Sequence, residues 1–193
     1  KTAVVERDYL GGICNNWGCI PTKALLRSAE IYHYMQNAKA YGLSADNVTF
    51  DPKAVIKRSR DVVSRLNTGV GFLFKKNKID HIQGHAKIVS GKTAHGPCRV
   101  DVFEPTGNYY NGAGDAKKLK QTMTADRVLI ATGAKPRELP FALTDGKQII
   151  SSYDAMNLPK KPESMVIVGS GAIGMEFAYF YNAFGTKVTV VEL

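Results

Sequence analysis

The stretch from Ser164 to Glu192 constrains the fold most, because it contains every part of a strand–turn–helix–strand unit. An apolar strand over 164–168 leads into Gly169-Ser170-Gly171-Ala172-Ile173-Gly174, which has the spacing GxGxxG. An apolar helix over 177–184 follows, and a second strand over 187–191 ends at Glu192. A lone GxGxxG is a weak signal. Here the strand before it, the helix after it and an acid about twenty residues on predict a nucleotide-binding α/β unit.

The glycines of this turn have separate expected tasks. Gly169 permits the tight turn, Gly171 lets the backbone approach a pyrophosphate, and Gly174 lets the helix pack close to the strand. The helix N-terminus would direct its partial positive charge at the phosphates. Glu192 is placed to bind the adenosine ribose hydroxyls. An acid at that position favours NAD over NADP, because it would repel a 2′-phosphate.

A second feature is the pair Cys14 and Cys19, which lie between Gly11-Gly12 and Pro21. Their spacing can close a small disulfide ring at the start of a helix. Zinc is a poor fit, because zinc knuckles need a two-residue gap and a second Cys or His pair. A purely structural disulfide stays possible, although so tight a ring constrains little of the unfolded chain. A redox disulfide explains spacing and setting, and the helix start is expected to lower the thiol pKa.

The remaining pattern predicts a mixed α/β chain. A buried parallel strand is expected over Thr2–Val5, ending at Glu6, and a helix from Asp51-Pro52 to about Lys76, where two glycines weaken the pattern. From His81 the hydrophobic period changes to two, which indicates short strands. Further expected segments are strands near 82, 86–88 and 100–102, a long hairpin loop over 104–118, a strand over 126–133 and a linker over about 141–150.

Composition narrows the function classes. The formal net charge is +9, but the basic residues are dispersed and no nucleic-acid-binding motif accompanies them, so we expect a solvated surface and sites for anionic cofactors. No run of about 18 apolar residues predicts a membrane span. Three cysteines are too few for a secreted disulfide scaffold and favour the cytoplasm. A chain that starts and stops on strands is typical of a piece of a longer protein.

The segment from Gly11 to Lys23 closely resembles the redox-disulfide signature of the flavoprotein disulfide reductases. The resemblance extends from Glu6 to Glu192, essentially the whole chain. It implies an α/β fold of three-layer β/β/α type. A Rossmann-like FAD-binding domain with an inserted β-meander would occupy residues 1–147, without its N-terminal GxGxxG strand. A second Rossmann-like domain, which binds NAD, would begin at residue 148 and continue to 193.

The resemblance also implies site residues. Cys14 would be the thiol that exchanges with a substrate disulfide, and Cys19 would pass electrons to the flavin. Lys23 would lie near the flavin nitrogen that receives hydride, paired with Glu176 in the first turn of its helix. No metal ligands are implied. The FAD contacts would be Glu6, Gly11, Gly12, Gly18, Lys23, Gly84, His85, Ala86, Ala131, Thr132 and Gly133, and the NAD contacts Gly169, Gly171, Gly174 and Glu192.

Pro21-Thr22-Lys23 followed by Ala24-Leu25-Leu26 resembles the branch of the family that oxidises dihydrolipoamide. That branch implies dihydrolipoamide or the lipoyl domain of a 2-oxo acid dehydrogenase complex as partner. It also implies a homodimer formed through a C-terminal domain outside these residues, with that domain's histidine as base. The 193 residues alone are therefore expected to be inactive. A mercuric reductase, a non-catalytic redox-switch fragment and nucleic-acid binding through the net charge remain alternatives.

Overall fold

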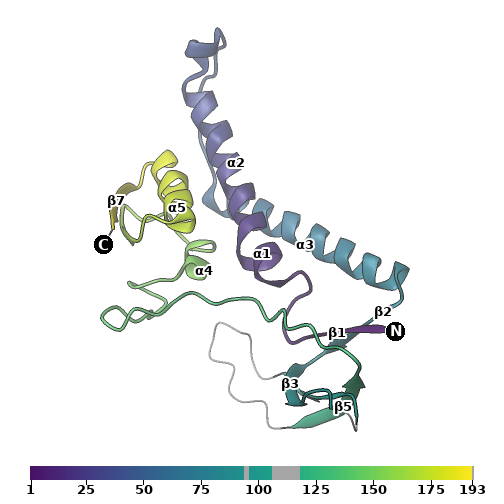
Figure 1. Cartoon of the computed structure of the whole chain (residues 1–193). Coiled ribbons are helices and arrows are strands. Elements are labelled where there is room, and N and C mark those ends of the chain that lie inside the picture. Colours follow the sequence, from purple (N-terminus) through teal and green to yellow (C-terminus); the bar gives the residue numbers. More distant parts are fainter. Residues whose placement is uncertain (94–95, 106–117, 193) are drawn as a thin grey trace. The chain divides into compact units, whose positions relative to one another are not determined.

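A computed structural model describes residues 1–93, 96–105 and 118–192 of the chain (Figure 1). Contacts gather the chain into two compact units. The first contains Lys1–Gly12 and Leu66–Lys135, and the second contains Ile13–Arg65 and Pro136–Leu193. The boundary expected after residue 147 concerns ligand-binding domains rather than these contact units, and it stays a prediction.

In the first unit, strand β1 (Thr2–Glu6) pairs in parallel with strand β2 (Ile79–Gln83), so that Thr2 lies opposite Ile79 and Glu6 opposite Gln83. The expected parallel strand is therefore present, but the expectation that it is buried was wrong. Thr2 and Ala3 are exposed, and Val4 and Val5 are half-buried. The reason is that β1 and β2 form a sheet of only two strands within the described residues.

The β-meander is an antiparallel sheet in the order β3 (His85–Ser90), β4 (Cys98–Phe103) and β5 (Leu119–Ala125). The strands expected near 86–88 and 100–102 are confirmed. Strand β5 was not predicted, because its residues are mostly polar and exposed and give little alternation. Most of the expected hairpin loop over 104–118 falls at 106–117, outside the described residues.

The strand expected over 126–133 was wrong. This segment forms no strand, and the side chains of Leu129 and Ile130 are 90% and 69% exposed. A run of β-branched and apolar residues becomes a strand only when a neighbour supplies the other half of its hydrogen-bond ladder. None of the strands within the described residues pairs with this segment.

Two helices and a glycine carry the cysteine segment. Helix α1 (Gly12–Trp17) and helix α2 (Cys19–Gln36) are separated by Gly18 alone, and a short 3₁₀ turn, Ala38–Tyr41, follows α2. Helix α3 (Pro52–Lys76) begins as predicted, because the Asp51 carboxylate accepts the Lys53 backbone N–H at 2.9 Å. Its 25 residues run without interruption through both glycines that weakened the pattern. No helix in the described part of the chain is long and apolar enough to cross a bilayer.

The nucleotide unit has the predicted order. Strand β6 (Ser164–Val168) and strand β7 (Lys187–Val191) pair in parallel, and helix α5 (Ala172–Ala183) connects them. Helix α5 starts earlier than its apolar pattern indicated, directly after Gly171. Helix α4 (Ser152–Ala155) precedes this unit and begins with a capping box, in which Ser151 and Asp154 bond reciprocally. The expected linker contains its own turn, because Asp145 accepts backbone N–H groups from residues 147–149.

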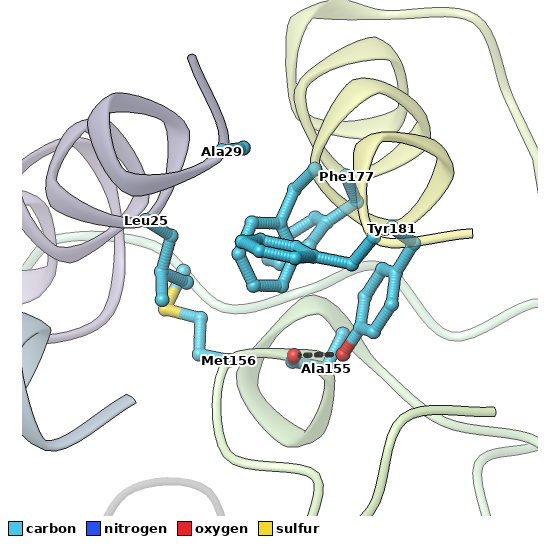
Figure 2. Packing of buried hydrophobic residues seen from close by; sticks show 8 residues of the cluster. Leu25, Ala29, Ala155, Met156, Phe177 and Tyr181 are labelled. Carbon is cyan, nitrogen blue, oxygen red and sulfur yellow. Dashed lines mark hydrogen bonds between the residues drawn. The ribbon is translucent and has the colours of Figure 1, made fainter. Parts of the chain in front are cut away.

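The core of the second unit lies between α2, α4 and α5 (Figure 2). Helix α2 contributes Leu25 and Ala29, which are one turn apart on one face. The Tyr181 hydroxyl donates a hydrogen bond to the Ala155 carbonyl at 2.5 Å, and burial raises the pKa of Tyr181, so it stays neutral. Helix α5 contributes the aromatic rings of Phe177, Phe180 and Tyr181, and its C-cap residue Phe184 adds a fourth ring.

Gly174 is held at a close approach that a side chain would break. A Cβ built on Gly174 would lie 2.2 Å from the Gly169 carbonyl oxygen and 3.3 Å from Ile167 Cγ2. We therefore expect Gly174→Ala to push α5 away from β6 and to lower the free energy of unfolding by about 1–3 kcal/mol, measured by urea denaturation. Gly69→Ala is the matched control, because Gly69 lies within α3 and no atom lies within 4 Å of its Cβ position. It should raise stability by up to about 1 kcal/mol. Equal effects of the two substitutions would contradict the close-approach argument.

Candidate functional site

The two cysteines lie on different helices on either side of a tight break. Gly18 leaves the helical region (φ −142°, ψ −119°), so that α1 ends at Trp17 and α2 begins at Cys19. A Cβ on Gly18 would lie 3.1 Å from both Cys14 Cα and the Ile13 carbonyl oxygen. Close packing against the backbone of α1 therefore favours glycine at this position. Both thiols are free and exposed.

The environment of Cys14 contains opposing effects on its pKa. The hydrogen bond that the Cys14 thiol donates to the Cys19 sulfur favours the protonated form and raises the pKa of Cys14 most, and burial raises it further. The backbone N–H groups of Cys19 and Ile20, at the start of α2, donate to the Cys14 sulfur and lower it. The net pKa is above its ordinary value. The expected lowering is therefore wrong for Cys14 in the dithiol form, because the neighbouring thiol outweighs the helix start.

Lys23 and Glu176 form the expected ion pair, between Lys23 Nζ on α2 and Glu176 Oε1 on α5. The hydrogen bond that Lys23 Nζ donates to the Glu176 carboxylate is the main reason that the pKa of Lys23 is raised, and both cysteines act electrostatically in the same direction. Lys23 lies one helical turn after Cys19, so the cation and the thiol share a face of α2. Glu176 is the fifth residue of α5 and not in its first turn, which corrects that expectation. The roles of both residues toward a flavin stay predictions.

The glycine turn and Glu192 come together as the motif predicts. Gly169 adopts a positive φ of 103°, and its N–H donates to the Val191 carbonyl at 2.8 Å. The Ser170 backbone N–H donates to the Glu192 carboxylate. Nothing lies within 4 Å of the Cβ position of Gly171, so the backbone there is open to a ligand. Binding of NAD by this turn stays a prediction.

In the first unit, the end of β1 lies against the start of β3. The Gly84 N–H donates to the Glu6 carbonyl at 2.9 Å, and the Glu6 carboxylate accepts the Asp8 N–H at 2.9 Å. Arg7 Nη1 lies 3.4 Å from His85 Nδ1. The structure therefore brings together three residues expected to contact FAD, which are Glu6, Gly84 and His85. Gly84 also has a packing reason, because a Cβ there would lie 2.5 Å from Val102 Cγ1.

The other expected FAD contacts are less well defined by the structure. Ala86 lies in β3, opposite Val102. Gly11, Gly12 and Gly133 have positive φ values of 94°, 64° and 73°, which favour glycine at each position. Ala131 and Thr132 are exposed and lie outside any strand. The ligand roles of these residues stay predictions.

Sequence reasoning missed two arginines of α3. Arg60 Nη1 donates to the Asn16 carbonyl at 2.9 Å, within the segment between the cysteines, and Arg58 Nη1 donates to the Ala24 carbonyl on α2 at 2.8 Å. No motif marks either arginine, because each acts on a backbone group more than thirty residues away in the sequence. Across the described ranges, no cluster of three or more His, Cys, Asp or Glu residues could hold a metal ion.

Comparison with known proteins finds similar proteins that share one name. The dihydrolipoyl dehydrogenase of Rhizobium etli is 50% identical over 195 residues, which cover all of this chain and 40% of that protein. Dihydrolipoyl dehydrogenases of Zymomonas mobilis and Bacillus subtilis are 45% and 40% identical, and this chain covers 38% and 39% of them. The chain therefore spans about 40% of the length of these curated relatives.

The crystal structure of LpdA from Mycobacterium tuberculosis superposes with a TM-score of 0.84, at 24% identity, over all of this chain and 39% of that one. At this identity the likeness shows the fold alone, which is the α/β Rossmann-like fold expected from the sequence. The family model for pyridine nucleotide-disulphide oxidoreductases matches residues 1–193. The chain therefore belongs to the pyridine nucleotide-disulphide oxidoreductase family.

Proposed function

We propose that this chain is part of an NAD-dependent flavoprotein that oxidises dihydrolipoamide through Cys14 and Cys19. The observation that carries the proposal is the arrangement of the pair. The Cys14 sulfur lies on the first amides of α2 and beside the Cys19 thiol, and both thiols are exposed. Relatives named dihydrolipoyl dehydrogenase, 40–50% identical over the whole chain, support the choice of substrate.

The residues present fit both cofactors. The open backbone at Gly171 and the nearby Glu192 carboxylate suit the pyrophosphate and ribose of NAD. Glu6 and the segment Gly84–Ala86 would hold the adenosine part of FAD, while Gly18 and Lys23 would serve the redox end. The bound cofactors would supply two-electron transfer between the cysteine pair and a nicotinamide. Lys23 and Glu176 would contribute a fixed electrostatic environment.

The cysteine pair accounts for the thiol chemistry. One thiolate of dihydrolipoamide attacks the sulfur of Cys14 in the Cys14–Cys19 disulfide, and Cys19 leaves as a thiolate. The second substrate thiolate then attacks the substrate sulfur of the mixed disulfide, and Cys14 leaves. The substrate loses two electrons and two protons and becomes a disulfide, while the pair gains the two electrons. The amides of Cys19 and Ile20 stabilise the departing Cys14 thiolate.

The wider setting is also a proposal. We place the protein in the cytoplasm, as a homodimer whose C-terminal domain supplies a histidine base, acting on the lipoyl domain of a 2-oxo acid dehydrogenase complex. The low cysteine content supports the cytoplasm, and the relatives named dihydrolipoyl dehydrogenase support a lipoyl partner.

Visible absorption of the whole flavoprotein of which this chain is proposed to be a part, recorded before and after addition of dihydrolipoamide, tests the proposal. We expect a flavin spectrum that gains a long-wavelength band, because a thiolate is then left beside the flavin. A flavin that does not respond to dihydrolipoamide would contradict this substrate and point to another disulfide or to a metal ion. A protein that binds no flavin would contradict the proposed function altogether.

Substitution of Cys19 tests the electrostatics of Cys14. Cys19→Ala removes the largest cause of the raised Cys14 pKa but keeps the backbone amides that lower it. We therefore expect the pKa of Cys14 to fall, so that more thiolate is present at pH 7.5. The measurement is the pH dependence of Cys14 alkylation by iodoacetamide, followed by peptide mass spectrometry in a Cys98→Ala background. An unchanged or higher midpoint would exclude this explanation.

Gly171→Ala separates ligand binding from folding. The backbone at Gly171 has φ −63° and open space around the Cβ position, so the protein accommodates alanine, and the urea midpoint should be unchanged. The added methyl would occupy the space through which a pyrophosphate reaches the backbone. We expect NADH affinity to fall by about tenfold or more, equivalent to about 1.4 kcal/mol, in a fluorescence titration. Unaltered affinity would show that this turn does not hold the pyrophosphate.

A further inference from the structure

The segment between the two cysteines is held by a residue from a distant helix. Helix α1 ends at Trp17, so its last carbonyls lack a following helical turn. Arg60 of α3 donates from Nη1 to the Asn16 carbonyl at 2.9 Å. Asn16 is only 4% exposed, and the bond is partly buried. A cation at this end of α1 also matches the negative end of the helix dipole.

Arg60 contacts the neighbouring side chain as well. Its guanidinium carbon lies 4.5 Å from the centroid of the Trp17 ring, within the range of a cation–π interaction. The Trp17 ring in turn lies 4.0 Å, centroid to centroid, from the ring of Tyr153. Two consecutive residues between the cysteines are thus held by one guanidinium.

Arg60 is half-buried, and much of its guanidinium is shielded from solvent. Its Nε and Nη2 atoms are buried and have no hydrogen-bond partner within the described residues. Burial lowers the pKa of Arg60, but an arginine stays charged at neutral pH. Such a buried cation is costly unless its surroundings stabilise it, and the described contacts that do so are the Trp17 ring and the Asn16 carbonyl.

We propose that Arg60 is a positioning residue that favours closure of the Cys14–Cys19 disulfide, an inference that rests on the redox role proposed for the pair. Holding Asn16 and Trp17 restricts the open dithiol and so raises the effective concentration of one thiol at the other. The same restraint changes the free energy of the disulfide form less, because its covalent ring already restricts these residues. On closure, the two thiols lose two electrons and two protons to an external disulfide.

Arg58 is a matched control on the same helix. Its Nη1 atom donates to the Ala24 carbonyl at 2.8 Å and lies 3.5 Å from Ser28 Oγ. This arginine is exposed, and its partners lie on α2 beyond the cysteine segment. Loss of Arg58 removes the same kind of bond between α3 and a backbone carbonyl, but leaves the residues between the cysteines as they are.

The experiment compares Arg60→Met with Arg58→Met in the purified protein. The cysteine pair is equilibrated with mixtures of oxidised and reduced dithiothreitol, and its oxidised fraction is read by alkylation and peptide mass spectrometry. We expect Arg60→Met to lower the equilibrium constant for ring closure about tenfold, which shifts the potential by about 30 mV to less negative values. Arg58→Met should leave it unchanged. Equal shifts in the two variants, or a more negative potential for Arg60→Met, would overturn the proposal.

Arg60→Lys guards against a folding defect. Lysine keeps the charge but loses the planar group that contacts the Trp17 ring. The potential of the cysteine pair in Arg60→Lys should therefore lie between those of the parent protein and Arg60→Met. If Arg60→Met does not fold, Arg60→Lys against Arg58→Lys decides the question in the same assay. A shift for Arg60→Lys no larger than for Arg58→Lys would then overturn the proposal.

The dithiothreitol equilibrium also separates this inference from the proposed function. It reports ring closure whether or not the protein accepts dihydrolipoamide. If ring closure depends on Arg60 but the protein does not react with dihydrolipoamide, the positioning role is supported and the proposed substrate is refuted. If the protein reacts with dihydrolipoamide but ring closure does not depend on Arg60, the proposed substrate is supported and the positioning role is refuted.

Discussion

The packing of α2 on α5 is the constraint that positions the ion pair between Lys23 and Glu176, beside the cysteine pair. Leu25 and Ala29 of α2 share a core with the aromatic rings of α5, and this contact places Lys23 opposite Glu176. The Lys23 side chain is 61% exposed, and an exposed ion pair stabilises a fold only weakly. The core therefore positions the charges, and the charges do not hold the helices together.

The break at Gly18 gives the cysteine pair different electrostatics in its different states. In the dithiol, the Cys19 thiol raises the pKa of Cys14 against two amides that lower it. In the mixed disulfide with substrate, the Cys14 sulfur carries no proton to donate to Cys19, whereas the amides of α2 remain. Cys14 is then a better leaving group than the dithiol form suggests, because a more stable thiolate leaves faster.

The parts of this structure that were predictable are those determined by local spacing. The turn Gly169–Gly174 and the start of α3 at Asp51-Pro52 carry their information within a few residues, and both were predicted correctly. The strand expected over 126–133 was wrong because a strand also needs a partner, which no local pattern supplies. Arg60 was missed for a related reason, since its partner Asn16 is 44 residues away.

Arg58 and Arg60 show why such contacts must be judged by burial rather than by bond type. Each donates to a backbone carbonyl at nearly the same distance, 2.8 and 2.9 Å. The exposed Arg58 exchanges its bond readily for one with water, so the bond restrains α2 little. Arg60 has two buried nitrogen atoms without a hydrogen-bond partner in the described structure, and it gives up the Trp17 ring if it moves. Burial of those two nitrogen atoms is a cost of the observed position, so the restraint on the cysteine segment comes from the shielded bond to the Asn16 carbonyl and from the contact with the Trp17 ring.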